Sequence, residues 1–344
     1  MKYMKRSFSG MKPYHSSLIT DGIVLNANES TISPPKAILD KFYEEIKNVS
    51  YNRYPDMDEE ELCKAIAKRF KIDSTNVSCG VGSDELLEVT FKAVLEPNDI
   101  VLGFTPSFSM YKVFADMVGA KYIPILGDSN MQFHVDDMIE KIKEYNPKLV
   151  LICSPNNPTG QFFSYQEVSK VIEATNSLVI LDLAYIDFAY EDYTLLALKY
   201  DNVISFRTFS KAMALPAIRV GYTISNKDNI DMINAIKAPY SVTTLSQILA
   251  KIAIENIDLY KEQITLFINE RNRLYNALIS LGFNAFKSEA NFIFLIMDEK
   301  YNDILLENKI YIRSFKNNFF RITVGTKEEN DKLLEVLKNA KCSF

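Results

Sequence analysis

Short apolar runs recur through the middle of this sequence and constrain its fold more than any other feature. Segments with helical periodicity separate most of them. The runs are VSCG (77–80), IVLGF (100–104), KLVLIC (148–153), LVILDL (178–183), VISF (203–206) and RVGYTI (219–224). Strands that alternate with helices are typical of a mostly parallel sheet covered by helices. The sequence therefore predicts a large α/β domain.

Helical patterns flank this region on both sides. In residues 34–49, apolar side chains recur every four positions, which predicts an amphipathic helix. A longer helical pattern runs over 243–281 without a glycine or proline. Thr326 and Glu329 fit a capping box at the start of a closing helix. The remaining predicted elements are the strands NFIFLI (291–296) and FRITVG (320–325) and a possible short strand in VLNAN (24–28).

The length of the chain, 344 residues, is large for a single hydrophobic core and favours two domains. We expect residues 45–245 to form the large domain. A smaller α+β domain is expected from residues 1–44 and 246–344, so that both termini contribute to it. The long helical segment would lead from one domain to the other.

The composition excludes several classes of protein. The formal net charge is -5, without the basic footprint that a nucleic-acid partner requires. No apolar run approaches the roughly 18 residues of a membrane span, and no apolar segment follows the positive charges of MKYMKRSFSGMK, so no signal peptide is predicted. The four scattered cysteines indicate a reduced cytoplasmic protein with mostly buried thiols. With only two histidines, no metal site or histidine-based triad is predicted.

A glycine-rich turn follows the first predicted strand. In GVGSDELLEV it opens a helix at Ser83 and Asp84. Free backbone N–H groups and the positive end of the helix dipole suit a phosphate at such a position. The turn fits neither the Walker A nor the G-x-G-x-x-G pattern. Taken alone, Ser83 could also be an ordinary N-cap.

Two further strands end in polar groups, at the edge where parallel sheets bind ligands. SPNNPTG, after KLVLIC, is a rigid turn that either is purely structural or holds an asparagine amide at the strand tip. Asp182 ends the next apolar run, where a carboxylate is either solvated or buried against a cation. Tyr185 adds a phenol to the same loop.

The segment FRTFSKAMALPAIRVGY (206–222) places Lys211 beside Thr208 and Ser210, with Arg219 eight positions later. A lysine becomes nucleophilic when burial and nearby positive charge lower its pKa. Arg219 could supply that charge, or it could bind a phosphate in a bidentate way. A solvated loop lysine is the structural alternative.

These groups would meet at one edge of one sheet, and together they match an aromatic aldehyde phosphate. Lys211 can condense with the aldehyde, and Asp182 can pair with the protonated ring nitrogen. An asparagine and Tyr185 can bond the ring hydroxyl, while a serine, Arg219 and the helix N-terminus bind the phosphate. That ligand is pyridoxal phosphate, for which a lysine with an aspartate is the expected signature.

Ten motifs spread over nearly the whole chain carry a family resemblance. They are KPYHSS, LNANES, YNRYPD, GVGSDE, PSFSMY, SPNNPTG, LDLAYIDF, FRTFSKAMALPAIRVGY, SEANFIF and FRITVGT. On these motifs the sequence resembles the fold-type-I aminotransferases and, within them, the histidinol-phosphate aminotransferases. The resemblance implies a large domain with a mostly parallel, seven-stranded sheet between helices, beside a smaller α+β domain. It also implies a homodimer.

The resemblance implies a role for each matching residue. The catalytic residues would be Lys211, Asp182 and Tyr185, with Lys211 as the general base. Tyr54 resembles the tyrosine that reaches the cofactor phosphate of the partner subunit, and Arg321 the arginine that grips the anionic end of the substrate. The cofactor would be bound by Ser83, Asp84, Phe108, Asn157, Asp182, Tyr185, Thr208, Ser210, Lys211, Arg219 and Tyr54. The substrate would be bound by Tyr14, Asn28, Asn157, Arg313 and Arg321.

Four positions depart from the family pattern. Leu183 stands where the family often has glutamate, and Pro216 and Ala217 stand where it often has Ala-Gly. Phe108 replaces the usual stacking tyrosine, but stacking needs only the face of the ring. None of these changes touches the predicted lysine, aspartate or phosphate contacts, but neighbouring families share most of the motifs.

The predicted activity is that of a pyridoxal-phosphate-dependent aminotransferase, which moves an amino group between L-histidinol phosphate and 2-oxoglutarate in a ping-pong reaction. A broad aromatic or branched-chain aminotransferase and a threonine-phosphate decarboxylase are the alternatives on the same scaffold. A cofactor-binding regulator would need a DNA-binding module, and a nicotinamide oxidoreductase would need a glycine-rich dinucleotide turn. Neither is found in the sequence.

Overall fold

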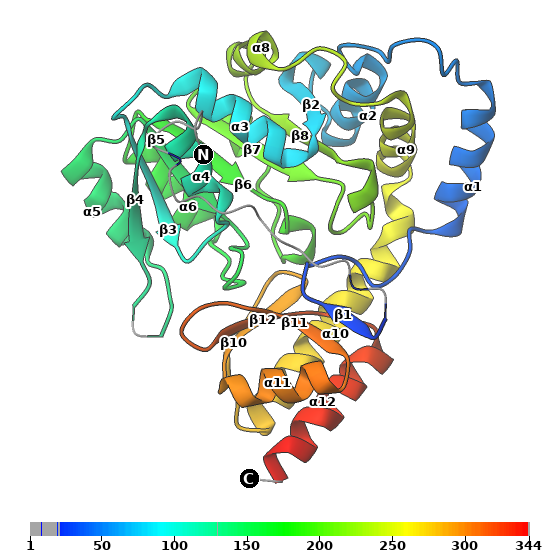
Figure 1. The fold of residues 1–344 in the computed structure, drawn as a ribbon. Helices are drawn as coiled ribbons and strands as arrows, with labels where there is room; N and C mark the ends of the chain where they lie inside the picture. Colours follow the sequence, from blue (N-terminus) through cyan, green and yellow to red (C-terminus); the bar gives the residue numbers. More distant parts are fainter. Residues whose placement is uncertain (1–7, 9–18, 20, 129, 343–344) are drawn as a thin grey trace.

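Two separate sheets organise the chain (Figure 1). The computed structural model describes residues 8, 19, 21–128 and 130–342. The larger sheet has seven strands, and only β8 runs antiparallel to its neighbours. In spatial order the strands are β2 (Val77–Val81), β8 (Val220–Ile224), β7 (Val203–Thr208), β6 (Leu178–Asp182), β5 (Leu149–Cys153), β3 (Ile100–Thr105) and β4 (Lys121–Leu126). The predicted α/β fold is confirmed.

Helices cover both faces of this sheet because side chains alternate along its strands. On β5, Leu149, Leu151 and Cys153 join the core with α3 and α4, whereas Val150 and Ile152 join the core with α5 and α6. The helices around the sheet are α3 (Gly82–Val94), α4 (Met110–Val118), α5 (Val135–Tyr145), α6 (Tyr165–Glu173), α7 (Leu196–Lys199) and α8 (Lys227–Ile236).

A third core lies at the β2 edge of the sheet. There α1 (Lys36–Glu45), α2 (Glu60–Phe70) and α9 (Thr244–Glu255) pack with β2 and β8. Ile38 of α1 and Leu249 of α9 are both buried in it. The division of the chain at residues 45 and 245 stays a prediction.

The smaller sheet joins the start of the chain to its end. Strand β1 lies beside β11 and parallel to it, whereas the other pairs of this sheet are antiparallel (Figure 1). Its strands, in spatial order, are β1 (Ile23–Leu25), β11 (Ile310–Ser314), β12 (Phe319–Thr323), β10 (Phe292–Ile296) and β9 (Asn284–Ala285). The helices that pack on it are α10 (Lys261–Ser280), α11 (Glu299–Glu307) and α12 (Lys327–Cys342).

The capping box that opens α12 is present as predicted. Glu329 accepts a hydrogen bond from the Thr326 N–H at 2.8 Å, and Thr326 Oγ1 accepts one from the Glu329 N–H at 3.3 Å. Strands β4, β9 and β11 were not predicted. β4 lies at the edge of its sheet, and Pro124 interrupts its apolar sequence KYIPIL. Its Pro124 is tolerated because an edge strand has one unpaired side.

The predicted continuous helix over 243–281 was wrong. Helix α9 ends at Glu255, and a 3-10 turn over Ile257–Tyr260 separates it from α10. Asn256 lies at the break, and its Nδ2 donates to the Ile252 carbonyl oxygen at 2.8 Å. Such a side-chain bond competes with the helical ladder.

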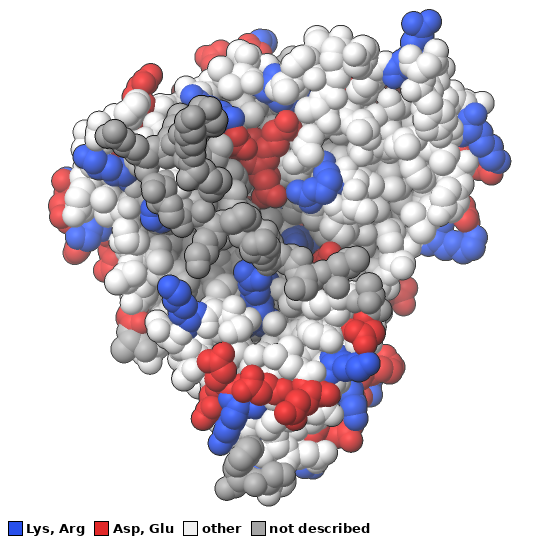
Figure 2. All heavy atoms as spheres, viewed as in Figure 1, with Lys and Arg blue, Asp and Glu red and all other residues white. Residues whose placement is uncertain are grey.

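The sequence also led to predictions about membrane spans, surface charge and the cysteines. Within the described part of the chain, no helix is both long enough and apolar enough to cross a membrane. Figure 2 shows acidic and basic side chains interspersed over the visible face. Cys63, Cys79 and Cys153 are free and buried, as expected for structural thiols, and Cys342 is exposed.

Candidate active site

The polar residues that follow four neighbouring strands meet at one edge of the large sheet. Phe108 follows β3, Asn157 follows β5, Asp182 ends β6 and Lys211 follows β7. The carboxyl ends of parallel strands form the usual ligand site of an open α/β sheet. Residues 26–29 and strand β12 of the small sheet reach the same place, as the contacts below show.

Lys211 is half-buried in the turn after β7. Its Nζ donates to the Ala27 carbonyl oxygen at 3.3 Å and lies 5.9 Å from the centre of the Tyr185 ring. Burial lowers the pKa of Lys211 to about 8, and the positive charges of Arg321 and Arg219 act in the same direction. A neutral amine is therefore accessible near neutral pH, as a nucleophile or general base requires.

Asp182 is buried, and each of its carboxylate oxygens accepts a hydrogen bond. Oδ1 accepts from the Ala184 N–H at 3.1 Å, and Oδ2 accepts from the Tyr111 hydroxyl. Burial raises the pKa of Asp182 to about 6, although both hydrogen bonds oppose the rise. A buried carboxylate in this state favours a cationic partner, such as a protonated ring nitrogen.

Tyr111 is a residue that the sequence analysis missed. It is the last residue of PSFSMY, three positions after Phe108, so the motif itself could have pointed to it. The two rings meet edge to face, with centroids 5.5 Å apart and an interplanar angle of 84°.

Hydrogen bonds at the substrate end tie the large sheet to the small one. Asn28 Nδ2 donates to the Tyr185 hydroxyl at 2.9 Å. Arg321, on β12, donates to Asn157 Oδ1 at 2.6 Å and to the Asn26 carbonyl oxygen at 2.8 Å. The structure therefore brings together four of the predicted residues across the boundary between the two sheets.

The start of α3 supplies backbone donors at the other end of the site. The helix begins at Gly82 after Val81, which makes no side-chain capping bond. The alternative reading of Ser83 as the N-cap was therefore wrong. The Gly82 N–H donates to the Arg219 carbonyl oxygen at 3.0 Å. The N–H groups that follow it in the first turn are those that could bind an anion. Arg219 lies beside this turn, and its NH2 group is 3.2 Å from Asp84 Oδ2.

Two hydroxyl-bearing side chains, Thr208 and Ser210, lie just before Lys211 in the chain. Thr208 Oγ1 donates to Ser210 Oγ at 3.0 Å and accepts from the Ser210 N–H at 3.1 Å. Both side chains are buried. Hydroxyl, guanidinium and helix-start N–H groups together form a donor set suited to a phosphate.

The remaining predicted residues are Tyr54, Arg313 and Tyr14. Tyr54 is 82% exposed and stacks on Tyr240, with 4.8 Å between ring centroids. Arg313 lies on β11, opposite Arg321 in the register of the small sheet. Tyr14 lies outside the described residues.

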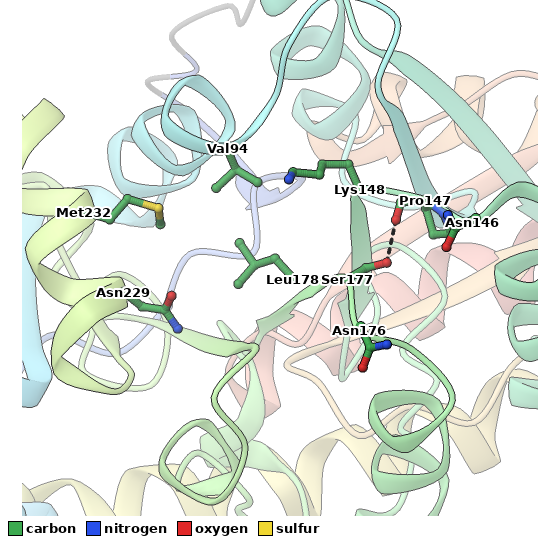
Figure 3. Close-up of a pocket in the computed structure, with 9 residues that line it drawn as sticks. All are labelled: Val94, Asn146, Pro147, Lys148, Asn176, Ser177, Leu178, Asn229 and Met232. Atoms are coloured by element: carbon green, nitrogen blue, oxygen red, sulfur yellow. Dashed lines mark hydrogen bonds between the residues drawn. The ribbon is translucent and has the colours of Figure 1, made fainter.

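A cavity of about 360 Å³ lies at the opposite edge of the large sheet (Figure 3). It is lined by residues that precede or begin β5 and β6, among them Lys148, Ser177 and Leu178, and by Asn229 and Met232 of α8. The candidate site follows the ends of those same strands, so this cavity is a separate feature.

The geometry fits pyridoxal phosphate. A lysine of lowered pKa, a buried carboxylate and an anion-binding helix start match its aldehyde, ring nitrogen and phosphate. Among the described residues, no group of three or more histidine, cysteine or acidic side chains could hold a metal ion. The fold and the site thus define a pyridoxal-phosphate-dependent aminotransferase. The family described as Aminotransferase class I and II matches residues 20–337, and the chain belongs to that family.

Within this family, the chain is similar to several histidinol-phosphate aminotransferases. The chain is 34% identical over 342 residues to histidinol-phosphate aminotransferase of Clostridium novyi (strain NT), covering 97% of this chain and 96% of that protein. The structure of histidinol-phosphate aminotransferase from Clostridium acetobutylicum matches with a TM-score of 0.86 at 26% identity, covering 94% of this chain and 100% of that one.

One solved structure contains the cofactor. Histidinol-phosphate aminotransferase from Sinorhizobium meliloti in complex with pyridoxal-5'-phosphate matches with a TM-score of 0.91, covering 100% of this chain and 98% of that one. The two sequences are 21% identical, so this likeness supports the fold.

Proposed function

We propose that this chain transfers an amino group between L-histidinol phosphate and 2-oxoglutarate, giving imidazole acetol phosphate and glutamate. The observation that carries the proposal is the position of Arg321, which is 8% exposed and bonded to Asn157 beside the cofactor residues. Arg313 lies opposite it on the neighbouring strand. Two guanidinium groups on adjacent strands suit a dianionic phosphate. The names of the relatives above support the same substrate.

When bound, pyridoxal phosphate supplies an aldehyde that takes the amino group and a ring that accepts electrons. The residues of the chain do the rest. Asp182 would hold the proton on the ring nitrogen. Lys211, as a neutral amine, would take the proton from the α-carbon of the substrate and deliver it to the carbon that had been the aldehyde. Asn157 and Tyr185 would orient the ring through its hydroxyl group, and Ser210, Arg219 and the first turn of α3 would hold the phosphate.

Phe108 would stack on the cofactor ring, and Thr208 would support Ser210 through their hydrogen bond. Asn28 would position Tyr185, to which it donates. These roles rest on the placement of the side chains around one site.

We propose in addition that two copies of the chain form a homodimer in which Tyr54 reaches the site of its partner. Large apolar side chains are exposed before α2 and at or beyond the end of α8. They are Tyr43, Tyr51, Tyr54, Met57, Ile236 and Tyr240. Such a group of exposed aromatic side chains is typical of an interface. Light scattering after size-exclusion chromatography tests the dimer. A cytoplasmic location stays a prediction from the free, buried cysteines.

A panel of amino donors tests the substrate. The purified protein with bound cofactor is mixed with histidinol phosphate, phenylalanine, tyrosine, leucine or threonine phosphate, and the loss of visible absorbance is followed in single turnovers. We expect histidinol phosphate to react fastest. Fast reaction with an amino acid instead would assign a broad aminotransferase, and release of carbon dioxide from threonine phosphate would assign a decarboxylase.

Two variants test whether Arg321 contacts the phosphate group of the substrate. Arg321→Lys should slow the reaction with histidinol phosphate, because a lysine keeps the charge but loses the planar fork. Arg273→Lys is the matched control, since Arg273 bonds Glu270 on α10. Equal rates in the two variants would contradict the proposed contact.

A further inference from the structure

Tyr111 is buried against Asp182, the carboxylic acid of the candidate site. It is not one of the residues that would bind the substrate. It lies in the first turn of α4 and is only 2% exposed. Its hydroxyl donates to Asp182 Oδ2, and its ring meets Phe108 edge to face. One side chain therefore contacts both the acid that would pair with the cofactor ring and the aromatic ring that would stack on it.

The hydrogen bonds of Asp182 fix the plane of its carboxylate. Oδ2 accepts from Tyr111, on α4, and Oδ1 accepts from the backbone N–H of Ala184. Since the backbone donor belongs to the same loop as Asp182, Tyr111 is the contact that joins the acid to a different element. Loss of its hydroxyl would leave the carboxylate held by one hydrogen bond, from the Ala184 N–H, instead of two.

The groups that face Asp182 also show what stabilises its charge. They are Tyr111 from α4, Cys153 from β5, Asp84 from α3 and Tyr185 from its own loop. All of these are neutral or negative near pH 7. In the protein alone, hydrogen bonds rather than a cation therefore favour the ionised form of Asp182.

We propose that Tyr111 is a positioning residue that keeps Asp182 oriented and ionised and braces Phe108 beside it. The inference rests on the proposed role of Asp182 as partner of the ring nitrogen. It predicts that the hydroxyl of Tyr111 acts on cofactor binding only through Asp182.

The test is a double-mutant cycle on cofactor affinity. Apoprotein of the wild type, Tyr111→Phe, Asp182→Asn and the double variant is titrated with pyridoxal phosphate by absorbance and fluorescence from pH 6 to 9. Tyr111→Phe should weaken binding about tenfold at pH 7, as expected for the loss of a hydrogen bond to a charged group. The loss should shrink toward pH 9, because Asp182 then ionises without the hydroxyl.

The double variant separates a positioning role from a structural one. In the Asp182→Asn background, Tyr111→Phe should cause no further loss, since the carboxylate on which it acts is gone. Tyr260→Phe is the matched control, because Tyr260 is a buried tyrosine whose hydroxyl has no hydrogen-bond partner among the described residues. It should bind the cofactor like the wild type, and thermal unfolding of all variants shows that they fold.

Two results would overturn the inference. Wild-type affinity and an unchanged pH profile in Tyr111→Phe would show that the hydroxyl has no such role. An equal loss in both backgrounds would show that Tyr111 only supports the fold. Wild-type affinity in Asp182→Asn would remove the proposed role of Asp182 itself, and this outcome is distinct from the other two.

Discussion

Replacement of Gly221 by alanine should disrupt the phosphate-binding end of the candidate site without removing any of its side chains. Gly221 lies on β8, where the strand passes directly under the first turn of α3. A Cβ at this position would lie 2.2 Å from the Ser83 backbone nitrogen and 2.5 Å from the Gly82 carbonyl carbon. Both are backbone atoms, so neither can rotate away.

The magnitude follows from these distances. Ordinary contact begins at 3.4 Å, so the start of α3 would have to move by more than an ångström relative to β8. Overpacking of this kind costs about 1–3 kcal/mol of folding free energy. Donors displaced by that distance no longer make good hydrogen bonds to an anion. If one charge-assisted bond is lost, the affinity for pyridoxal phosphate should fall by about 10- to 100-fold.

The assay combines denaturant unfolding of the apoprotein with cofactor titration. Gly103→Ala is the matched control, because its Cβ would meet the Tyr122 hydroxyl at 2.4 Å. That hydroxyl is the end of a side chain and can move. The control should lose some stability but keep its cofactor affinity within about threefold. The reasoning is refuted if Gly221→Ala binds the cofactor like the wild type, or if both variants lose affinity equally.

Three further predictions test other parts of the structure. Arg207→Met should lower the free energy of unfolding by about 3–5 kcal/mol, measured by urea denaturation. It leaves the carboxylate of Asp187, whose side chain is only 11% exposed, without its partner at 2.6 Å. Since the pKa of Asp182 is raised from 3.8 to about 6, the folded apoprotein binds its proton more tightly than the unfolded chain does. Its contribution is therefore fully present below pH 3.8 and is lost as the pH rises through about 6. Relative to Asp182→Asn, the wild type should lose about 2.4 kcal/mol of stability between pH 4 and 7. Asn157→Ala should raise the KM for the amino donor about tenfold in steady-state assays, because Arg321 loses the partner that orients it at 2.6 Å; an unchanged KM would contradict that role.

Most of the order of the elements in the large sheet, and the grouping of the candidate site residues at one of its edges, could be predicted from the sequence. Alternating short strands and helices leave few arrangements other than a mostly parallel sheet, because a parallel pair requires a crossover. Parallel strands end at the same edge, so Asp182 and Lys211 could be assigned to one site although neither residue is near the other in the chain. The capping box of Thr326 and Glu329 could also be predicted, because it depends on residues only three positions apart.

Other features depend on contacts between distant segments, which no local pattern records. Nothing in the sequence pairs the hydroxyl of Tyr111 with Asp182, or the amide of Asn28 with Tyr185. The close approach of Gly221 to α3 likewise requires β8 to be inserted antiparallel between β2 and β7. Composition and periodicity thus determined the fold class and the chemical groups, since these follow from each residue and its neighbours. Only the tertiary structure decided which groups touch, and through burial it shifted the pKa values of Lys211 and Asp182 toward neutrality.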